Sequence, residues 1–96
     1  MFELAIRLAP QDPEPHVNLG FVLQRTRRVD DAIREFREAI RLAPQHASAW
    51  INLGIALAER GLRDEAAAAF RSVLRFDPNN AGARENLELL LNPRPR

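Results

Sequence analysis

The sequence predicts a right-handed all-α solenoid of about six helices, and three observations lead to that fold. The six residues AIRLAP occupy positions 5–10 and again 39–44, and the related VLRFDP occupies positions 73–78, so the repeat length is 34 residues. Within each period, apolar residues recur at the i, i+3, i+4 spacing of an amphipathic helix. Proline closes each period. Two helices in a period of this length are typical of hairpins that bury a shared core only when several copies stack.

The composition excludes several classes of protein. The 96 residues are 46% hydrophobic and 28% charged, which is ordinary for one small folded domain. No apolar run reaches the roughly 20 residues of a membrane span, and no signal pattern is present, so we expect a cytoplasmic protein without membrane contact. The absence of cysteine excludes disulfides and thiolate metal sites.

The cationic residues are unusual because all 14 are arginine and none is lysine, although the net charge is only +1. We interpret this as the codon bias of a GC-rich, bacterial genome, since the arginines are spread along the chain. The alternative is selection for forked donors that bind carboxylates or phosphates.

The first hairpin is predicted from residues 14–26 and 31–42. The first of these segments has a wide apolar face, and Asp12 is placed to cap it. In the second segment the apolar residues again have helical spacing. Asp30 is the expected N-cap, and Pro44 ends the helix.

The second hairpin repeats this arrangement. Helices are predicted over residues 48–60 and 65–76, with Asp64 as the N-cap of the latter and Pro78 as its stop. A further helix is expected at 81–91, with no second helix after it.

Two glycines, Gly20 and Gly54, lie in the middle of predicted helices, where each costs about 1 kcal/mol relative to alanine. Close approach of a neighbouring helix would offset that cost. We expect the small residues Ala32, Ala39 and Ala66 on the second helices to provide the contact surface.

These residues resemble the tetratricopeptide repeat (TPR), a 34-residue family with the pattern W-x2-L-G-x2-Y, then A-x3-F, then P. The second period matches this pattern at Trp50, Leu53, Gly54, Leu57, Ala66, Phe70 and Pro78. The first period matches at His16, Leu19, Gly20, Leu23, Ala32, Phe36 and Pro44. The departures are histidine for tryptophan at His16, leucine for tyrosine at Leu23 and Leu57, and Val73 for a small alanine. We interpret His16 as a core substitute for the tryptophan.

The resemblance divides the chain into parts with different roles. The predicted boundaries are a partial repeat at 1–12, full repeats at 13–46 and 47–80, a capping helix at 81–92 and a flexible tail at 93–96. In the capping helix, the positions that would face a following helix carry the polar residues Arg84 and Glu88. We therefore expect a solvent-facing end of the array.

The chain starts within a repeat, because residues 1–8 correspond to a second helix whose first helix is missing. We expect a fragment of a longer array, or a chain that obtains the missing helix elsewhere. Phe2, Leu4 and Ile6 then lack a partner on one side, which favours self-association or domain swapping. The alternative is a short terminal helix that frays.

Candidate catalytic groups do not form a constellation. His16 and His46 lack metal-ligand spacing, and His46 is interpreted as a turn residue or a helix cap. Ser48 and Ser72 have no base at motif spacing. The paired acids start helices, where the helix dipole favours negative charge. We predict no catalytic residues, no metal and no cofactor, and therefore a protein that is not an enzyme.

The resemblance implies that the first helices line a concave groove for an extended peptide. The residues expected to line it are Glu14, Val17, Asn18, Phe21 and Gln24 in the first helix, Ser48, Ile51, Asn52, Ile55 and Glu59 in the next, and Glu85, Asn86 and Leu89 in the last. An asparagine amide both donates and accepts, so Asn18, Asn52 and Asn86 could pair with a peptide backbone. They could equally bond a neighbouring repeat, and the apolar residues could simply fill the space between helices.

The predicted partner is a protein or peptide, held as by a scaffold or adaptor. One alternative is a structural spacer, or a homo-oligomer formed through the N-terminal edge. A minor alternative is an acidic partner or nucleic acid on an arginine-rich edge formed by Arg25, Arg27, Arg28, Arg60 and Arg63. Nucleic acid is disfavoured because no aromatic residues are interleaved for base stacking.

Overall fold

The computed structural model describes residues 11–93 and contains only helices within that range. The all-α prediction is therefore confirmed. The predicted partial repeat at 1–12 falls almost wholly outside the described residues, as does the tail beyond residue 93. The helices are α2 (Glu14–Arg25), α3 (Val29–Leu42), α4 (Ala47–Glu59), α5 (Arg63–Phe76) and α6 (Ala81–Leu91).

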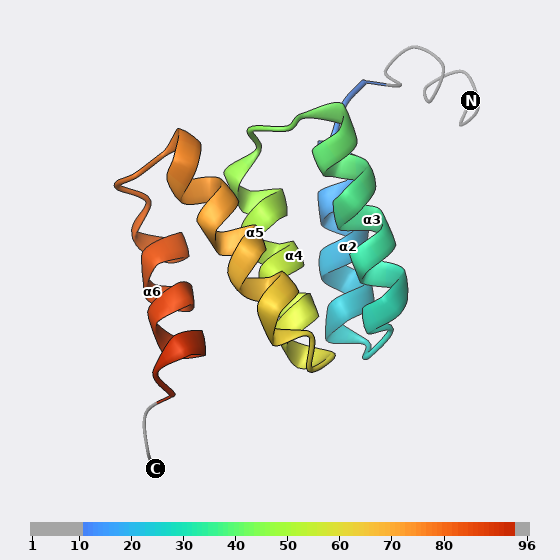
Figure 1. The fold of residues 1–96 in the computed structure, drawn as a ribbon. Helices are drawn as coiled ribbons and strands as arrows, with labels where there is room; N and C mark the ends of the chain where they lie inside the picture. The colour runs from blue at the N-terminus through green and yellow to red at the C-terminus, as the bar shows by residue number, and fades with distance from the viewer. Residues whose placement is uncertain (1–10, 94–96) are drawn as a thin grey trace, which may run out of the picture.

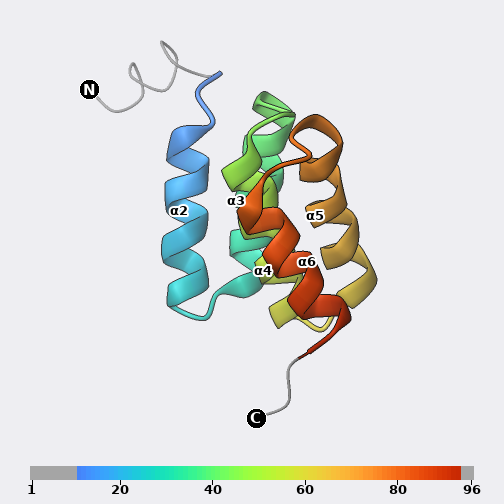
Figure 2. The ribbon, with the colours of Figure 1, turned by 90° about the vertical axis from the view of Figure 1, so that its left-hand side faces the viewer.

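The helices stack as a solenoid of hairpins, as predicted. Helix α2 packs on α3 and α4 packs on α5, while α3 meets α4 and α5 meets α6 between hairpins. In Figure 1, α3 lies in front of α2 and α5 lies in front of α4. The first helices also touch one another, α2 with α4 and α4 with α6. In Figure 2, which looks along the stack, α6 lies in front of α4 and α2 lies to their left.

The close approach predicted at the two mid-helix glycines is present, but its partner is different. A Cβ atom on Gly20 would lie 2.5 Å from Cε1 of Phe36, and one on Gly54 would lie 2.5 Å from Cε1 of Phe70. Both phenyl rings are buried. The nearest atoms to each glycine thus belong to a phenyl ring edge rather than to the predicted alanines. Each glycine is thus required by the ring of its own hairpin.

Side-chain caps begin the first helices at the repeat spacing. Oδ1 of Asp12 accepts the N–H of Glu14 at 3.0 Å, although Pro13 rather than Asp12 occupies the N-cap position of α2. Nδ1 of His46 and Oδ1 of Asn80 each accept the N–H three residues further on, at 3.2 and 2.9 Å. These bonds satisfy N–H groups that a helix start leaves without an intrahelical partner. Aspartate, histidine and asparagine therefore all accept a backbone N–H at the start of a first helix in successive repeats.

The second helices begin differently, and two predicted caps were wrong. Helix α3 begins at Val29 and α5 at Arg63, so Asp30 and Asp64 lie inside the first turn, and neither helix has a side-chain cap. The chain enters these helices directly from the turn after the preceding helix. The acids remain favourable there because the helix dipole stabilises negative charge.

The turn inside each hairpin needs a left-handed residue. Gly61 has φ +81° and supplies it without strain, but the equivalent residue 34 positions earlier is Arg27, with φ +67°. In the first hairpin the N–H of Arg28 donates to the carbonyl oxygen of Leu23 at 2.8 Å, and the second hairpin has the same bond at 2.9 Å. This pattern is the Schellman motif, whose left-handed position favours glycine.

Replacing Arg27 with glycine is expected to stabilise the fold. A side chain at this φ costs roughly 1–2 kcal/mol, partly offset by the greater freedom of glycine in the unfolded chain. We expect the free energy of unfolding in urea to rise by about 0.5–1 kcal/mol. The converse variant Gly61→Ala should lower it. An Arg27→Gly variant less stable than the parent would contradict this account.

The first helix has an open apolar face. Leu19 and Val22 are 47% and 55% exposed, whereas the equivalent Leu53 and Ala56 of α4 are 4% and 0% exposed. The residues of α4 share a buried cluster with Ile33 of α3. Within residues 11–93, no helix covers α2 in the way that α3 covers α4.

Candidate functional site

The residues predicted to line a groove lie on three helices, α2, α4 and α6. Nε2 of Gln24 donates to Oε1 of Glu59 at 2.6 Å, which joins α2 to α4. At the other end of α4, a Cβ atom on Gly82 of α6 would lie 3.5 Å from Cδ1 of Ile51. Side chains that are 30 or more residues apart in sequence therefore meet on one face.

The predicted groove residues differ in exposure. Seven are exposed: Glu14, Asn18, Phe21, Ser48, Glu59, Glu85 and Leu89. Five are partly buried: Gln24, Ile51, Asn52, Ile55 and Asn86. Twelve of the thirteen predicted residues are thus at least partly exposed to solvent.

Val17 does not belong to the groove surface. It is only 6% exposed and packs with Ala39 of α3 and Ala49 of α4. The small side chains of the two alanines leave room for the valine between the helices. Val17 is therefore a core residue, and its prediction as a ligand contact was wrong.

The three asparagines are not equivalent. Nδ2 of Asn86 donates to the carbonyl oxygen of Gly82 at 2.8 Å within its own helix. In the described part of the chain, no hydrogen bond joins Asn18 or Asn52 to a neighbouring repeat. The alternative role predicted for the asparagines, a bond between repeats, is thus not seen between residues 11 and 93.

The apolar part of the face has two separate centres. On α2, the Phe21 ring is half exposed, and the guanidinium carbon of Arg25 lies 5.6 Å from the ring centroid, a cation–π contact. Between α4 and α6 there is an open hollow of about 340 Å³. The residues around the hollow are Ile55, Ala58, Glu59, Phe70, Asn86, Leu89 and Leu90.

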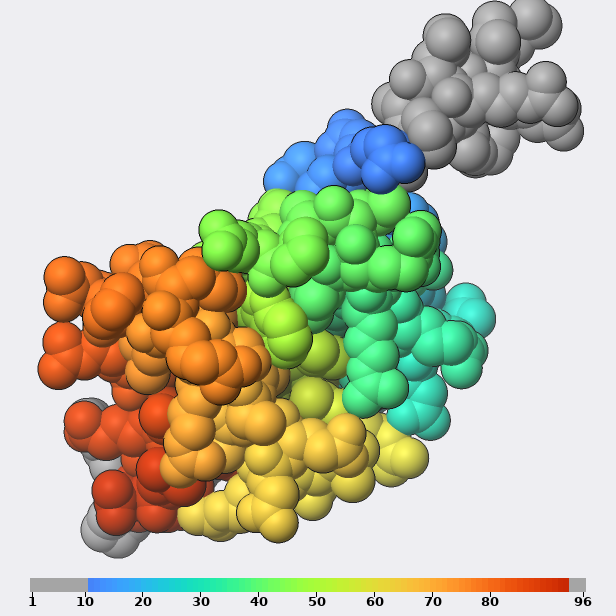
Figure 3. Space-filling model, turned by 45° about the horizontal axis from the view of Figure 1, so that its top comes forward, coloured from blue at the N-terminus to red at the C-terminus, as the bar shows by residue number. Residues whose placement is uncertain are grey.

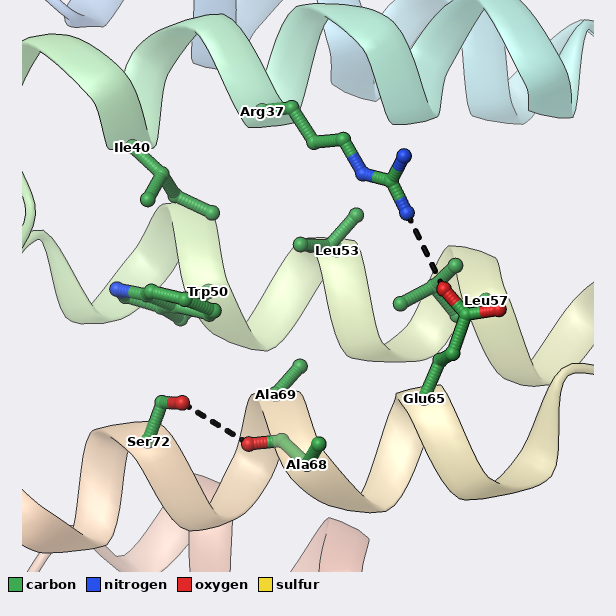
Figure 4. A pocket seen from close by; sticks show the side chains of 9 residues that line it. All are labelled: Arg37, Ile40, Trp50, Leu53, Leu57, Glu65, Ala68, Ala69 and Ser72. Atoms are coloured by element: carbon green, nitrogen blue, oxygen red, sulfur yellow. Dashed lines mark hydrogen bonds and ion pairs between the residues drawn. The ribbon is translucent and has the colours of Figure 1, made fainter.

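A second hollow, which the sequence analysis missed, lies on the side of α3 and α5. Figure 3 shows α4 in yellow-green between green α3 and orange α5. The hollow measures about 370 Å³ and is lined by Arg37, Ile40, Trp50, Leu53, Leu57, Glu65, Ala68, Ala69 and Ser72. Figure 4 shows Arg37 reaching across it to Glu65, at 3.3 Å. The signal in the sequence was the run of small residues on α5, because short side chains there leave the space unfilled.

His46 caps α4, as one of its two predicted roles required, whereas the ion-pair partners of both histidines were not predicted. Nδ1 of His16 lies 2.8 Å from Oε1 of Glu35, and the ring is partly exposed. The prediction that His16 replaces a core tryptophan was wrong, because its ring bonds a carboxylate at the open end of the stack. His46 caps α4 through Nδ1, so its Nε2 carries the proton and donates to Oε2 of Glu14 at 2.6 Å.

Within residues 11–93, no group of three or more metal-ligating side chains is positioned to hold an ion. None of the helices in this range is both long and apolar enough to cross a membrane.

The proposed arginine-rich edge is interrupted by acids. Arg28 lies 2.8 Å from Asp31, and Arg60 lies 2.5 Å from Asp30 of the neighbouring hairpin. These carboxylates reduce the positive potential that a phosphate backbone would need.

Between residues 11 and 93, shifted pKa values occur in one exposed pair on α3. The guanidinium of Arg41 hydrogen-bonds to Glu38 at 3.1 Å, which lowers the pKa of the Glu38 carboxyl and raises the pKa of Arg41. An ion pair three residues apart on an exposed helix surface accounts for both shifts.

Comparisons with known proteins agree with the repeat pattern. The sequence model described as tetratricopeptide repeat matches residues 17–81. No curated protein matches the chain. Among solved structures, the chain is similar to the second TPR domain of the human RPAP3 protein, whose NMR structure is a complex with the HSP70 peptide SGPTIEEVD. The two have a TM-score of 0.82 and 21% sequence identity, over 94% of this chain and 75% of that chain. At this identity the likeness shows a shared fold.

Proposed function

The chain belongs to the tetratricopeptide repeat family, and on that premise we propose that it is a protein-interaction module that binds an extended peptide or partner segment along α2, α4 and α6. The observation that carries this proposal is the hollow of about 340 Å³ between α4 and α6, with Leu89 exposed beside it. Concave apolar surfaces with a few polar groups are the usual form of a binding site.

The chemistry of the face suits an extended peptide. Such a peptide has unpaired N–H and C=O groups, and an asparagine amide can both donate to and accept from them. Asn18 and Asn52 lie on α2 and α4 at the same register, so they could hold successive parts of one backbone. The apolar surface would then supply affinity through peptide side chains. That the RPAP3 domain binds a peptide supports a ligand of this class.

The proposal is tested with two leucines of the same helix. Leu89 on the groove and Leu91 on another face of α6 are 39% and 44% exposed, so they form a matched pair. Peptides selected by display on the parent chain are expected to bind Leu89→Ser about tenfold more weakly, because a leucine contact is worth roughly 1.5 kcal/mol. In isothermal titration calorimetry, the dissociation constant of Leu91→Ser should stay within about twofold of the parent value, because Leu91 does not contact the peptide.

Two results would contradict peptide binding at this face. If no peptide is selected, or if Leu89→Ser and Leu91→Ser bind equally well, the face of α2, α4 and α6 is not the binding surface. Circular dichroism of both variants ensures that a loss of binding is not a loss of fold.

A second candidate function is self-association through the open face of α2. The observation that favours it is the exposure of Leu19 and Val22, whose equivalents in α4 are buried. Apolar patches of this kind mark contact surfaces when they are large enough. Light scattering across a range of protein concentrations tests it, since a constant monomer mass excludes this function.

A further inference from the structure

We infer that the hollow between α4 and α6 takes the side chain of a lysine or arginine, so that the groove selects peptides with a basic residue beside apolar ones. This inference rests on the proposed function, and it specifies the chemistry of the ligand. Three features of the hollow lead to it: its walls, its rim and the surrounding charge.

The walls are apolar. Ile55 of α4 and Leu89 and Leu90 of α6 line the hollow, with the buried Phe70 of α5 behind them. A volume of about 340 Å³ admits one long side chain. Lysine and arginine have stems of three or four methylene groups that pack along such surfaces while the charged end stays in water. The walls alone would also accept leucine or methionine.

The rim distinguishes these possibilities because it offers acceptors. Glu59 is exposed, and the bond from Gln24 to its Oε1 holds the carboxylate at the rim while Oε2 stays available as an acceptor. Asn86 uses its Nδ2 to bond Gly82, which turns its carbonyl oxygen away from that bond. In residues 11–93 no hydrogen bond reaches this oxygen. Lysine and arginine are the side chains that carry only donors and a full positive charge.

The surrounding charge favours the same ligand. Among the residues that line this hollow, Glu59 is the charged one, so its carboxylate sets the local charge. Arg84 and Glu85 of α6 both line a different hollow, together with Asn79 and Glu88. Arg25 lies on α2, stacked on Phe21. A cationic ligand group would therefore be attracted here, and an acidic one would meet like charge.

The test uses a matched pair of carboxylates. Glu59→Gln keeps the shape and the acceptor for Gln24 but removes the charge, and Glu65→Gln makes the same change on the side of α3 and α5. Peptides selected on the parent chain are expected to contain lysine or arginine. Replacing that residue with norleucine, which keeps the stem and removes the charge, should weaken binding to the parent about fivefold. The replacement should cost little with Glu59→Gln and the full fivefold with Glu65→Gln.

The possible failures are distinguishable. If the selected peptides lack basic residues, or if norleucine costs as much with Glu59→Gln as with the parent, the inference is overturned. The groove itself then stands as long as Leu89→Ser still weakens binding. If Leu89→Ser binds as well as the parent, or if no peptide is selected, the proposed function fails and the inference fails with it.

Discussion

A Gly54→Leu variant is expected to lose the folded state at room temperature. A Cβ atom at this position would lie 2.5, 2.7 and 2.9 Å from three carbons of the Phe70 ring. The ring is 2% exposed and packs among buried side chains of α3, α4 and α5, so moving it away from a leucine would disrupt that packing. Overpacking by single methylene groups already costs about 1–3 kcal/mol, and leucine adds four carbon atoms. Because small domains are stable by only about 5–15 kcal/mol, separation of α4 from α5 is the expected outcome.

Thermal melting followed by circular dichroism measures this effect. Gly82→Ala is the control, since a Cβ atom there would lie 3.4 Å or more from its neighbours, within ordinary contact. It should leave the melting temperature unchanged or slightly raised. A second-site change gives an independent check: Phe70→Leu should partly restore the stability of Gly54→Ala, because the smaller side chain releases the contact. An unchanged melting curve for Gly54→Leu would disprove the proposed role of the ring.

Phe36→Ala is expected to lower the free energy of unfolding by about 3–5 kcal/mol. Phe36 has no exposed surface and fills the space between α2 and α3 beside Gly20. Its removal leaves a cavity that two rigid helices cannot close. In a solenoid, stability is a sum of hairpin terms and contacts between neighbours. The first hairpin should therefore open before the second.

Urea denaturation measures the total effect, and hydrogen exchange with mass spectrometry locates it. Protection should fall most in α2 and α3. Phe21→Ala is the matched control, since this ring is half exposed on the groove face, and it should cost less than about 1 kcal/mol. Equal losses for Phe36→Ala and Phe21→Ala would contradict the packing described here.

Much of the fold was predictable because the repeat is visible in the sequence. The period identifies the hairpins, and proline marks where each second helix ends. Helix starts were predicted well only where a side chain accepts a backbone N–H of the first turn, as at Asp12. At Asp30 and Asp64 the prediction failed because an acid in the first turn and an acid at the cap have the same local sequence signature.

The sequence predicted which side of each helix the proposed groove residues occupy. It did not predict the shape of the surface between the helices. The spacing of Asn52, Ile55 and Glu59 places them on one side of α4, and the resemblance identifies that side. Whether a space remains between helices depends on how far neighbouring side chains reach, which the spacing does not reveal. Val17 was misassigned for the same reason, because its burial depends on alanines in two other helices. Binding of a ligand in the groove stays a prediction.

The recurrence of the same contacts at each seam has a consequence for the length of the molecule. His46 and Asn80 cap equivalent helices, and α5 meets α6 as α3 meets α4. A tandem copy of residues 47–80 inserted after residue 80 would therefore find a compatible surface on both sides. Growth by duplication of one 34-residue module would lengthen the groove without any new kind of contact. Chains of this design can thus gain or lose surface on the side of α2, α4 and α6 in whole 34-residue modules through a single recombination event.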